Sequence, residues 1–269
     1  MEKPKPNWRG WLKEYAVIVI GVLTALAAQQ AADWWRWRSE VAEARILITS
    51  ELAGNVRQAI WRLRTEKCGE RRLDELGAIL DNASRTGALP PVGDIGTPPP
   101  GLWISGAWES AESSQAAVHF PRQEMAALTT IYKFIQRANE LNSQESIQWN
   151  ELYAIVGPGR RMDAASEARL RSALSQARAL NRAMTVVGDN IVQKVKALAL
   201  PFSSQDLDSI ARGKREPLVK SRNEFSFTGY VCAPIEQVPA VYGQAGYKFV
   251  PYRNDEQVKK IPEFGEGAH

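Results

Sequence analysis

The stretch EYAVIVIGVLTALAAQQAADWWRWR, residues 14–38, has no charged side chain between Glu14 and Asp33. The 18 uncharged residues between them would form a helix about 27 Å long, close to the roughly 30 Å hydrocarbon thickness of a bilayer. The strongly apolar part, 16–28, has only 13 residues, and that length is also typical of signal peptides and buried helices. Length alone therefore leaves three alternatives: a membrane anchor, a cleaved signal peptide or a core helix.

Tryptophans on both sides of the apolar stretch favour the membrane anchor. Indole rings prefer the membrane–water interface because they combine an apolar body with an N–H donor. A buried helix of a soluble domain has no comparable reason to end in tryptophans interleaved with arginines. Five of the nine tryptophans flank the stretch, and these candidate interface residues are Trp8, Trp11, Trp34, Trp35 and Trp37. We therefore expect an uncleaved transmembrane helix at 14–35.

The signal-peptide alternative rests on Ala25-Leu26-Ala27, which has the small-x-small form of a cleavage site behind a basic start. Against it, residues 1–14 contain two prolines, two tryptophans and two acidic side chains. Four Lys or Arg lie in the first 13 residues and three in the 15 residues after Ala32, a small bias that favours a cytoplasmic N-terminus. We expect residues 1–13 in the cytoplasm and the rest of the chain outside it.

Small residues recur on one side of the expected anchor. Gly21 and Ala25 are four positions apart, as are Ala28 and Ala32, and such spacing lets a second transmembrane helix approach closely. Alanine is common in this stretch, so chance is the alternative explanation. The expected partners are the lipid bilayer and another membrane protein or a second copy of this chain.

Helical periodicity continues beyond the tryptophans toward residue 67. Apolar residues recur mostly every fourth position from Val41 to Leu63, with charged residues between them, as in a helix with one buried face. Cys68-Gly69 marks a break or kink, after which we expect a shorter helix at 71–82. The sequence thus predicts a long helix that leaves the bilayer and enters a folded domain.

The rest of the chain predicts more helices around a connector that cannot be helical. Residues 86–102 contain five prolines and four glycines, which favours an extended, polyproline-like loop. Further helices are expected at 103–119, 122–142, 146–156 and 162–200. The predicted fold class is all-α: a transmembrane helix continuing into an antiparallel helical bundle over 36–200.

Composition changes after Pro201. Eight of the 14 Phe and Tyr residues and five prolines lie in 214–269. Phe225 and Phe227 are two positions apart and so are, after Gly229, Tyr230 and Cys232, a spacing that is typical of extended chain. We expect 201–269 to be an extended aromatic arm that lies in a groove of the helical domain, with a solvated tail from Arg253 onward.

The charge balance and the cysteine count exclude several classes of partner. Residues 1–14 contain four Lys or Arg and two Glu, or +2, so the other 255 residues carry only the remaining +2 of the net +4. A nucleic-acid-binding surface needs clustered basic residues, so no nucleic-acid partner is expected. Cys68 and Cys232 are the two cysteines, and with two histidines they form no zinc motif. They are either a disulfide, if the domain lies in an oxidising compartment, or two buried thiols.

No arrangement of side chains indicates catalysis. There is no GxSxG motif, and His119 before Phe120-Pro121 fits a helix end better than a base. Glu109 and Glu112 lie three apart beside Trp108, as in a solvated helix face. GPGRR at 157–161 offers an anion site at a helix N-terminus, or a connector capped near Asp163. We expect no catalytic, cofactor-binding or metal-binding residue.

Several segments together resemble a known group of proteins. They are LKEYAVIVIGVLTALAAQQAADWW, a charged helix after it, WISGAWESAESSQAAVHFP and a helix with IYKFI. This order is similar to that of uncharacterised single-pass inner-membrane proteins of proteobacterial type, which share an EY-apolar-GxLxAL anchor and an SAWE-like helix. GAWES replaces the SAWE-type motif here, and the C-terminal arm has no counterpart. The resemblance implies the architecture and the bacterial inner membrane, and no activity.

Three functions are compatible with these observations. The first is a membrane-anchored, non-catalytic interaction or structural subunit, which needs an anchor and a helical surface but no reactive site. The second is a ligand-sensing ectodomain; only 13 residues precede the span, so a partner protein would have to relay its signal. The third is an enzyme, for which the sequence offers no site. We favour the first.

Overall fold

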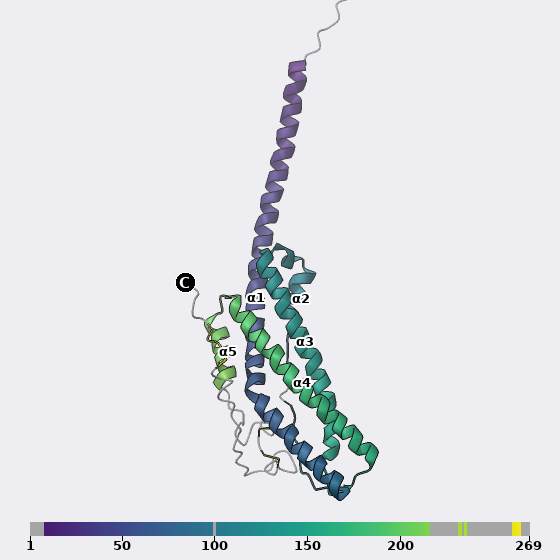
Figure 1. Ribbon diagram of the computed structural model, residues 1–269. Coiled ribbons are helices and arrows are strands. Elements are labelled where there is room, and N and C mark those ends of the chain that lie inside the picture. Colours follow the sequence, from purple (N-terminus) through teal and green to yellow (C-terminus); the bar gives the residue numbers. More distant parts are fainter. Residues whose placement is uncertain (1–7, 99–100, 216–230, 233, 236–259, 265–269) are drawn as a thin grey trace, which may run out of the picture.

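Helices make up most of the chain. The computed structural model describes residues 8–98, 101–215, 231–232, 234–235 and 260–264 (Figure 1). The α-helices are α1 (Trp8–Thr86), α2 (Gly106–Ser113), α3 (Arg122–Leu152), α4 (Ala164–Ala197) and α5 (Ser204–Arg215). The 3-10 helices are η1 (Ala116–His119) and η2 (Tyr153–Ile155), and the strands are β1 (Ala88–Leu89) and β2 (Arg160–Arg161). An all-α class is confirmed.

α1 is one helix of 79 residues. The break expected at Cys68-Gly69, with a separate helix at 71–82, is therefore wrong, although α1 changes direction in its lower half (Figure 1). The Thr65 hydroxyl donates within the helix to the carbonyls of Trp61 at 3.0 Å and Arg62 at 3.1 Å. Hydroxyl bonds of this kind to preceding carbonyls bend helices, so hydrogen bonding continues where the axis turns.

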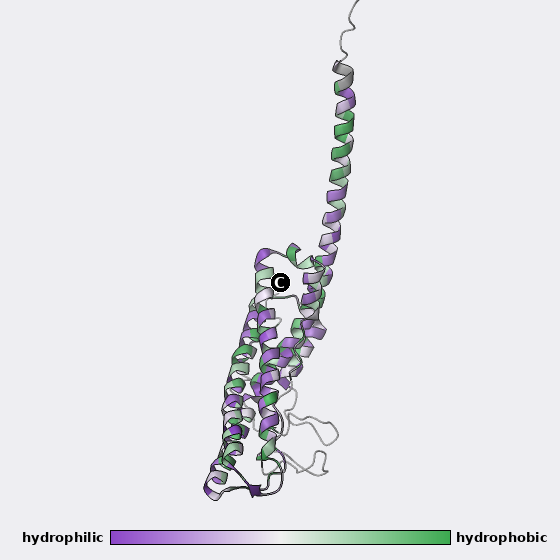
Figure 2. Ribbon diagram, turned by 90° about the vertical axis from the view of Figure 1, so that its right-hand side faces the viewer, coloured by the Kyte–Doolittle hydropathy of each residue, from purple (hydrophilic) through white to green (hydrophobic). Residues whose placement is uncertain are grey.

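The first part of α1, before Trp37, stands clear of all other described elements (Figure 1). Among the described residues it holds the one stretch that is long and apolar enough to cross a membrane, and none of that window is buried. Figure 2 shows this stretch as a hydrophobic band above the more polar remainder. A signal sequence has the same length and composition, so the stretch is a candidate span and both alternatives stay open.

The lower half of α1 packs with α3 and α4 into the helical body, residues 41–215. α3 and α4 lie side by side, and α4 returns in the opposite direction to α3 (Figure 1). Asp163 begins α4 as its N-cap, accepting from the Ser166 backbone N–H at 2.8 Å, as expected from the sequence. Apolar faces of the three helices meet in the core, with Leu52, Ile60, Leu128, Ile135, Ile191 and Val195 all fully buried.

Two helix predictions need correction. Residues 103–119 do not form one helix, because Gln115 adopts a left-handed φ of 66° between α2 and η1. Residues 122–142 and 146–156 belong largely to one helix, α3. Non-glycine residues seldom adopt positive φ, so the first error has no clear signal in the sequence.

The Pro/Gly-rich connector at 86–102 is not helical in its described part after Thr86, which ends α1, so the prediction of a non-helical connector holds there. β1 pairs antiparallel with β2, and Val92 forms a bridge with Gly157. Asn55 of α1 holds the chain just after the connector by exchanging two hydrogen bonds with the Ile104 backbone, at 2.7 and 3.0 Å. Leu89 and Ile95 are buried, so the connector is part of the core.

The expectation of an extended arm from residue 201 is wrong at its beginning. Residues 204–215 form α5, which packs on α1. Ser203 and Asp206 form a reciprocal capping pair, with Asp206 N–H to Ser203 Oγ at 3.1 Å and Ser203 N–H to Asp206 Oδ2 at 3.1 Å. This S-x-x-D pattern is a helix-start signal. Phe225, Phe227 and Tyr230 lie outside the described residues, as does most of the tail after Arg253.

Candidate functional site

Four of the five candidate interface tryptophans lie along the free part of α1. Trp8, Trp34 and Trp35 are exposed by 64%, 55% and 70%, and Trp11 lies in α1 without a described side chain. Trp8 and Trp34 are 26 positions apart, or about 39 Å along a helix, against about 40–45 Å for a bilayer with its headgroups. Arg38 lies over the Trp34 ring at 5.2 Å. The two groups of indoles are therefore spaced as two interfaces would be.

The fifth tryptophan connects α1 to the helical body. The Trp37 ring stacks on His119 of η1, with ring centroids 4.0 Å apart and planes at 22°. About two turns further along α1, Arg45 forms a two-pronged ion pair with Glu124 of α3, both distances 2.8 Å. The hydrogen bond from Arg45 to Glu124 raises the pKa of Arg45. We call these four side chains the collar; they fasten α3 and η1 to α1 just below the candidate span.

The small residues of the span face no other described element. Gly21, Ala25, Ala28 and Ala32 are all exposed, and a Cβ built on Gly21 would meet nothing within 4 Å. Their role as a packing surface stays a prediction.

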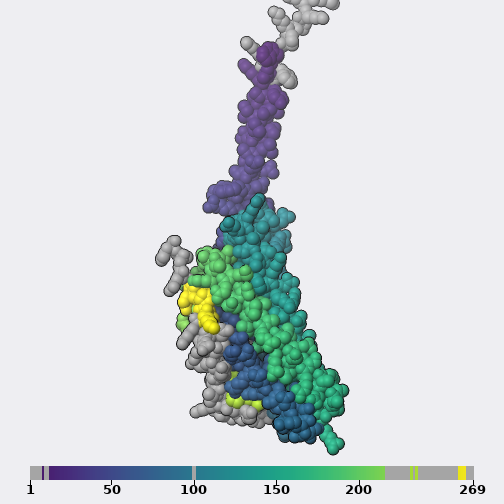
Figure 3. All heavy atoms as spheres, in the orientation of Figure 1, coloured from purple at the N-terminus to yellow at the C-terminus, as the bar shows by residue number. Residues whose placement is uncertain are grey.

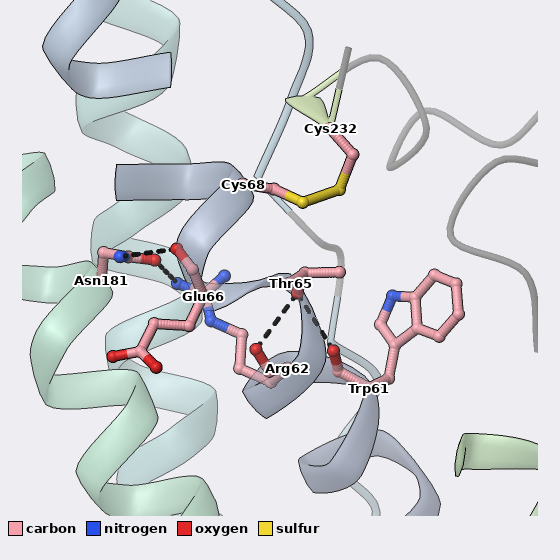
Figure 4. The surroundings of a disulfide bond; sticks show 7 residues. All are labelled: Trp61, Arg62, Thr65, Glu66, Cys68, Asn181 and Cys232. Carbon is pink, nitrogen blue, oxygen red and sulfur yellow. Dashed lines mark hydrogen bonds between the residues drawn. A yellow bond between two sulfur atoms is a disulfide. The ribbon is translucent and has the colours of Figure 1, made fainter. Parts of the chain in front are cut away.

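Deep in the body, a disulfide joins Cys68 of α1 to Cys232, 164 positions along the chain, with their Cα atoms 4.6 Å apart (Figure 4). Both cysteines are 1% exposed, and Val231 beside Cys232 is 2% exposed. The structure therefore has the disulfide, which is one of the two alternatives that the sequence leaves open for these cysteines. It attaches the segment that follows α5 to the lower half of α1.

A buried ionic cluster lies beside this disulfide. Arg62 of α1 donates from Nη2 to Glu145 Oε1 of α3 at 2.6 Å and to Asn181 Oδ1 of α4 at 2.9 Å. Arg62 and Glu145 are each 1% exposed. Asn181 in turn donates to the Glu66 carbonyl of α1 at 3.4 Å (Figure 4). We call Arg62, Glu145 and Asn181 the triad; it joins the three long helices at one level.

The triad does not satisfy all of its own polar atoms. Arg62 Nε, Arg62 Nη1 and Glu145 Oε2 are buried without a hydrogen-bond partner among the described residues. This cluster is absent from the residues predicted from the sequence, although the sequence carries a signal for it. Glu145 follows Leu141 by four positions and Asn181 follows Ala177 by four, so both continue the buried stripes of their helices.

A second group of polar contacts holds the connector. The Arg72 guanidinium is fully buried, bonded to Glu75 at 2.8 Å and to the Ile95 carbonyl. Burial lowers the pKa of Arg72 below its ordinary value. Asp94 accepts from the Gly96 N–H at 2.8 Å and from the Tyr153 hydroxyl at 3.1 Å. These hydrogen bonds fix the conformation of the connector and do not form a reactive centre.

The carboxylates that the sequence singled out do not converge on one site. Glu109 accepts from Ser105 at 2.6 Å on the surface, and Glu112 is exposed. Glu51 instead accepts from the Tyr132 hydroxyl at 2.7 Å and from the Ala107 N–H at 2.8 Å. Burial, with the bond to Glu51, raises the pKa of Tyr132. Within the residues searched, no group of three His, Cys, Asp or Glu could hold a metal ion.

In the GPGRR segment, the Arg160 side chain is bonded to nearby backbone carbonyls. The Arg160 guanidinium donates to the carbonyls of Ala154, Val156 and Pro158. The hydrogen bonds from Ser166 that hold Asp163 as a cap also lower the pKa of Asp163. The arrangement is that of a capped connector, which was the alternative to an anion site.

The stack between Trp37 and His119 should contribute measurably to stability. We expect Trp37→Ala and His119→Ala to show a coupling energy of about 0.5–1.5 kcal/mol in a double-mutant cycle, as for other ring pairs. The measurement is the free energy of unfolding of the full chain in detergent. Trp34→Ala, on the outer side of the same helix, is the matched control and should show no coupling to His119. Independent effects of Trp37 and His119 would contradict the stack.

Comparison with protein-family models, with curated proteins and with solved structures gives no match to this chain.

Proposed function

We propose that this protein is a single-pass protein of the bacterial inner membrane that acts as a non-catalytic interaction or structural subunit. Residues 1–13 lie in the cytoplasm, 14–35 cross the bilayer, and the helical body works on the periplasmic side. The observation that carries the proposal is the continuity of α1, which passes without interruption from an exposed apolar stretch into the core of the body. Such a helix places the body within reach of proteins at the membrane surface.

The disulfide supports a periplasmic location for the helical body. Disulfides persist in the periplasm and are rare in the bacterial cytoplasm, and Cys68–Cys232 is bonded and buried. A body in the cytoplasm would leave the segment around Cys232 without this covalent attachment.

Fewer observations favour the ligand-sensing alternative. A pocket of about 530 Å³ lies between α5 and residues 263–264, and one of about 390 Å³ lies beside Arg45 and Glu124. Both are at the edge of the body, and the first is lined by charged residues such as Asp208, Lys214 and Arg215. Neither enters the core between α1, α3 and α4.

Fractionation of the full chain tests the anchor. We expect the protein in alkali-washed membranes, with its body cleaved by protease added to spheroplasts and protected in intact cells. Ala27→Leu, which would block cleavage by signal peptidase, should leave the mass of the chain unchanged. A mature chain that begins near residue 28, or recovery in the soluble fraction, would overturn the proposal.

Copurification from native membranes in mild detergent separates the two functions. A stoichiometric protein partner is expected for the interaction subunit. A chain that purifies without a partner but with a small molecule bound would favour the ligand-sensing alternative.

A further inference from the structure

We propose that a second copy of this chain docks in parallel along one line of α1 that runs from Gly21 to Ile46. The proposal deepens the proposed function and rests on it for the membrane location. The four small residues of the span continue down the helix at Trp35, Ser39, Ala42 and Ile46. We call these eight positions the seam.

The spacing along the seam is that of a coiled coil. Successive members are alternately four and three positions apart over the whole length, an average of 3.5 residues. Helices with this repeat of small or apolar residues wind around each other with a left-handed twist. Small residues alone would not indicate a partner, but here the same repeat leaves the apolar span and continues into the water-exposed part of α1.

The helical body leaves the seam open. Ile46 is 70% exposed, whereas Ile48 is 1% exposed and Leu52 fully buried. The body thus covers one apolar line of α1 and leaves another free. Figure 3 shows the upper part of α1 rising bare above the body. The next position of the repeat, Thr49, is 4% exposed, so the seam ends where the body closes around α1.

The charged residues beside the seam favour a second copy of this chain as the partner that docks on it. In heptad terms the seam alternates a and d positions, with Ser39 at a and Ala42 at d. In a parallel pair, the g residue, just before a, faces the e residue of the partner helix, which is five positions further along the sequence. Arg38 and Glu43 have this separation, flank the seam at Ser39 and Ala42, and are both exposed. Glu43 has no ion-pair partner among the described residues, while Arg45, one heptad after Arg38, is engaged by Glu124. Two copies would form two equivalent Arg38–Glu43 pairs.

Membrane insertion fixes the orientation. Two copies with the same topology can meet only in parallel, and a parallel symmetric pair places each position of the seam against itself. Small residues suit this close approach in the span. At the interface, Ala32 and Ser39 lie one layer above and one layer below Trp35, which leaves room for two indoles. The seam is therefore self-complementary in shape and in charge.

Cysteine crosslinking in native membranes tests the seam. In the full chain, Ala42→Cys and Ile46→Cys should give a disulfide-linked dimer after mild oxidation, seen at twice the mass on a non-reducing gel. Leu47→Cys is the matched control, because Leu47 is also exposed, by 59%, but lies off the seam. We expect it to crosslink far less.

Charge reversal tests the pairing. In the Ala42→Cys chain, Arg38→Glu should reduce the dimer about fivefold, as two exposed ion pairs become repulsions, and adding Glu43→Arg should restore it. Equal crosslinking at Ala42 and Leu47, no rescue by the double reversal, or an adduct of another mass only would overturn the proposal. If the same variants still fractionate with the membrane, the proposed function survives that failure; if they are soluble, both fail.

Discussion

Glu145→Ala is expected to lower the free energy of unfolding by about 3–5 kcal/mol, the usual cost of removing one partner from a buried ion pair. The substitution would leave the Arg62 guanidinium, which is 1% exposed, with Asn181 as its remaining side-chain acceptor. Arg62 already has two donor nitrogens without partners among the described residues, so the cluster has no spare acceptor to replace the carboxylate.

The measurement is denaturant unfolding of the full chain in detergent, followed by the fluorescence of buried tryptophans such as Trp149. Glu140→Ala on the same helix is the matched control. Its pair with Arg137 is exposed, and we expect a loss of at most about 1 kcal/mol.

A second variant separates charge burial from packing. Arg62→Met combined with Glu145→Leu removes both charges and keeps the volume, and such replacements of buried ion pairs are commonly neutral or stabilising by about 1–4 kcal/mol. We expect the double variant to be more stable than Glu145→Ala. If Glu145→Ala costs no more than Glu140→Ala, Arg62 and Glu145 are not an obligate pair.

Loss of the disulfide has the second largest expected effect. Cys68→Ser should lower the free energy of unfolding by about 2–5 kcal/mol, because the crosslink closes a long loop and restricts the unfolded chain. The loop spans 164 positions, which places the chain-entropy estimate at the top of that range, about 5 kcal/mol.

Non-reducing gels and denaturation give the readout. The native chain should shift in mobility on reduction, and Cys68→Ser should not. Cys232→Ser and the double variant should match Cys68→Ser in stability, since each removes the same bond. A native chain whose stability does not change on reduction would contradict the prediction.

The long elements could be predicted because burial imposes a regular spacing on them. The stripes of α1, α3 and α4 recur every three or four residues, and the tryptophans around the apolar stretch are a positional signal that needs no tertiary information. α5 carried a readable start at Ser203 and Asp206, but the proline and aromatic content of its surroundings outweighed that signal.

What the sequence could not reveal depends on contacts between distant segments. The positive φ of Gln115 separates α2 from η1, and no property of glutamine indicates it. The triad needs three helices to align at one level before Arg62, Glu145 and Asn181 become neighbours. The stack of Trp37 on His119 likewise joins residues 82 positions apart. Among these residues, Glu145 and Asn181 are the ones whose places in apolar stripes hint at a buried role.

The bend near Thr65 has a mechanical consequence. α1 is about 120 Å long at 1.5 Å per residue, and it is one uninterrupted helix from Trp8 to Thr86. If its upper part is anchored in a bilayer as proposed, a movement there would be transmitted along the helix into the body. A straight rod turned about its axis would only spin in place. Because α1 is bent, a rotation of its upper part about its own axis would move its lower part, which carries Cys68 and the segment bonded to it, along an arc.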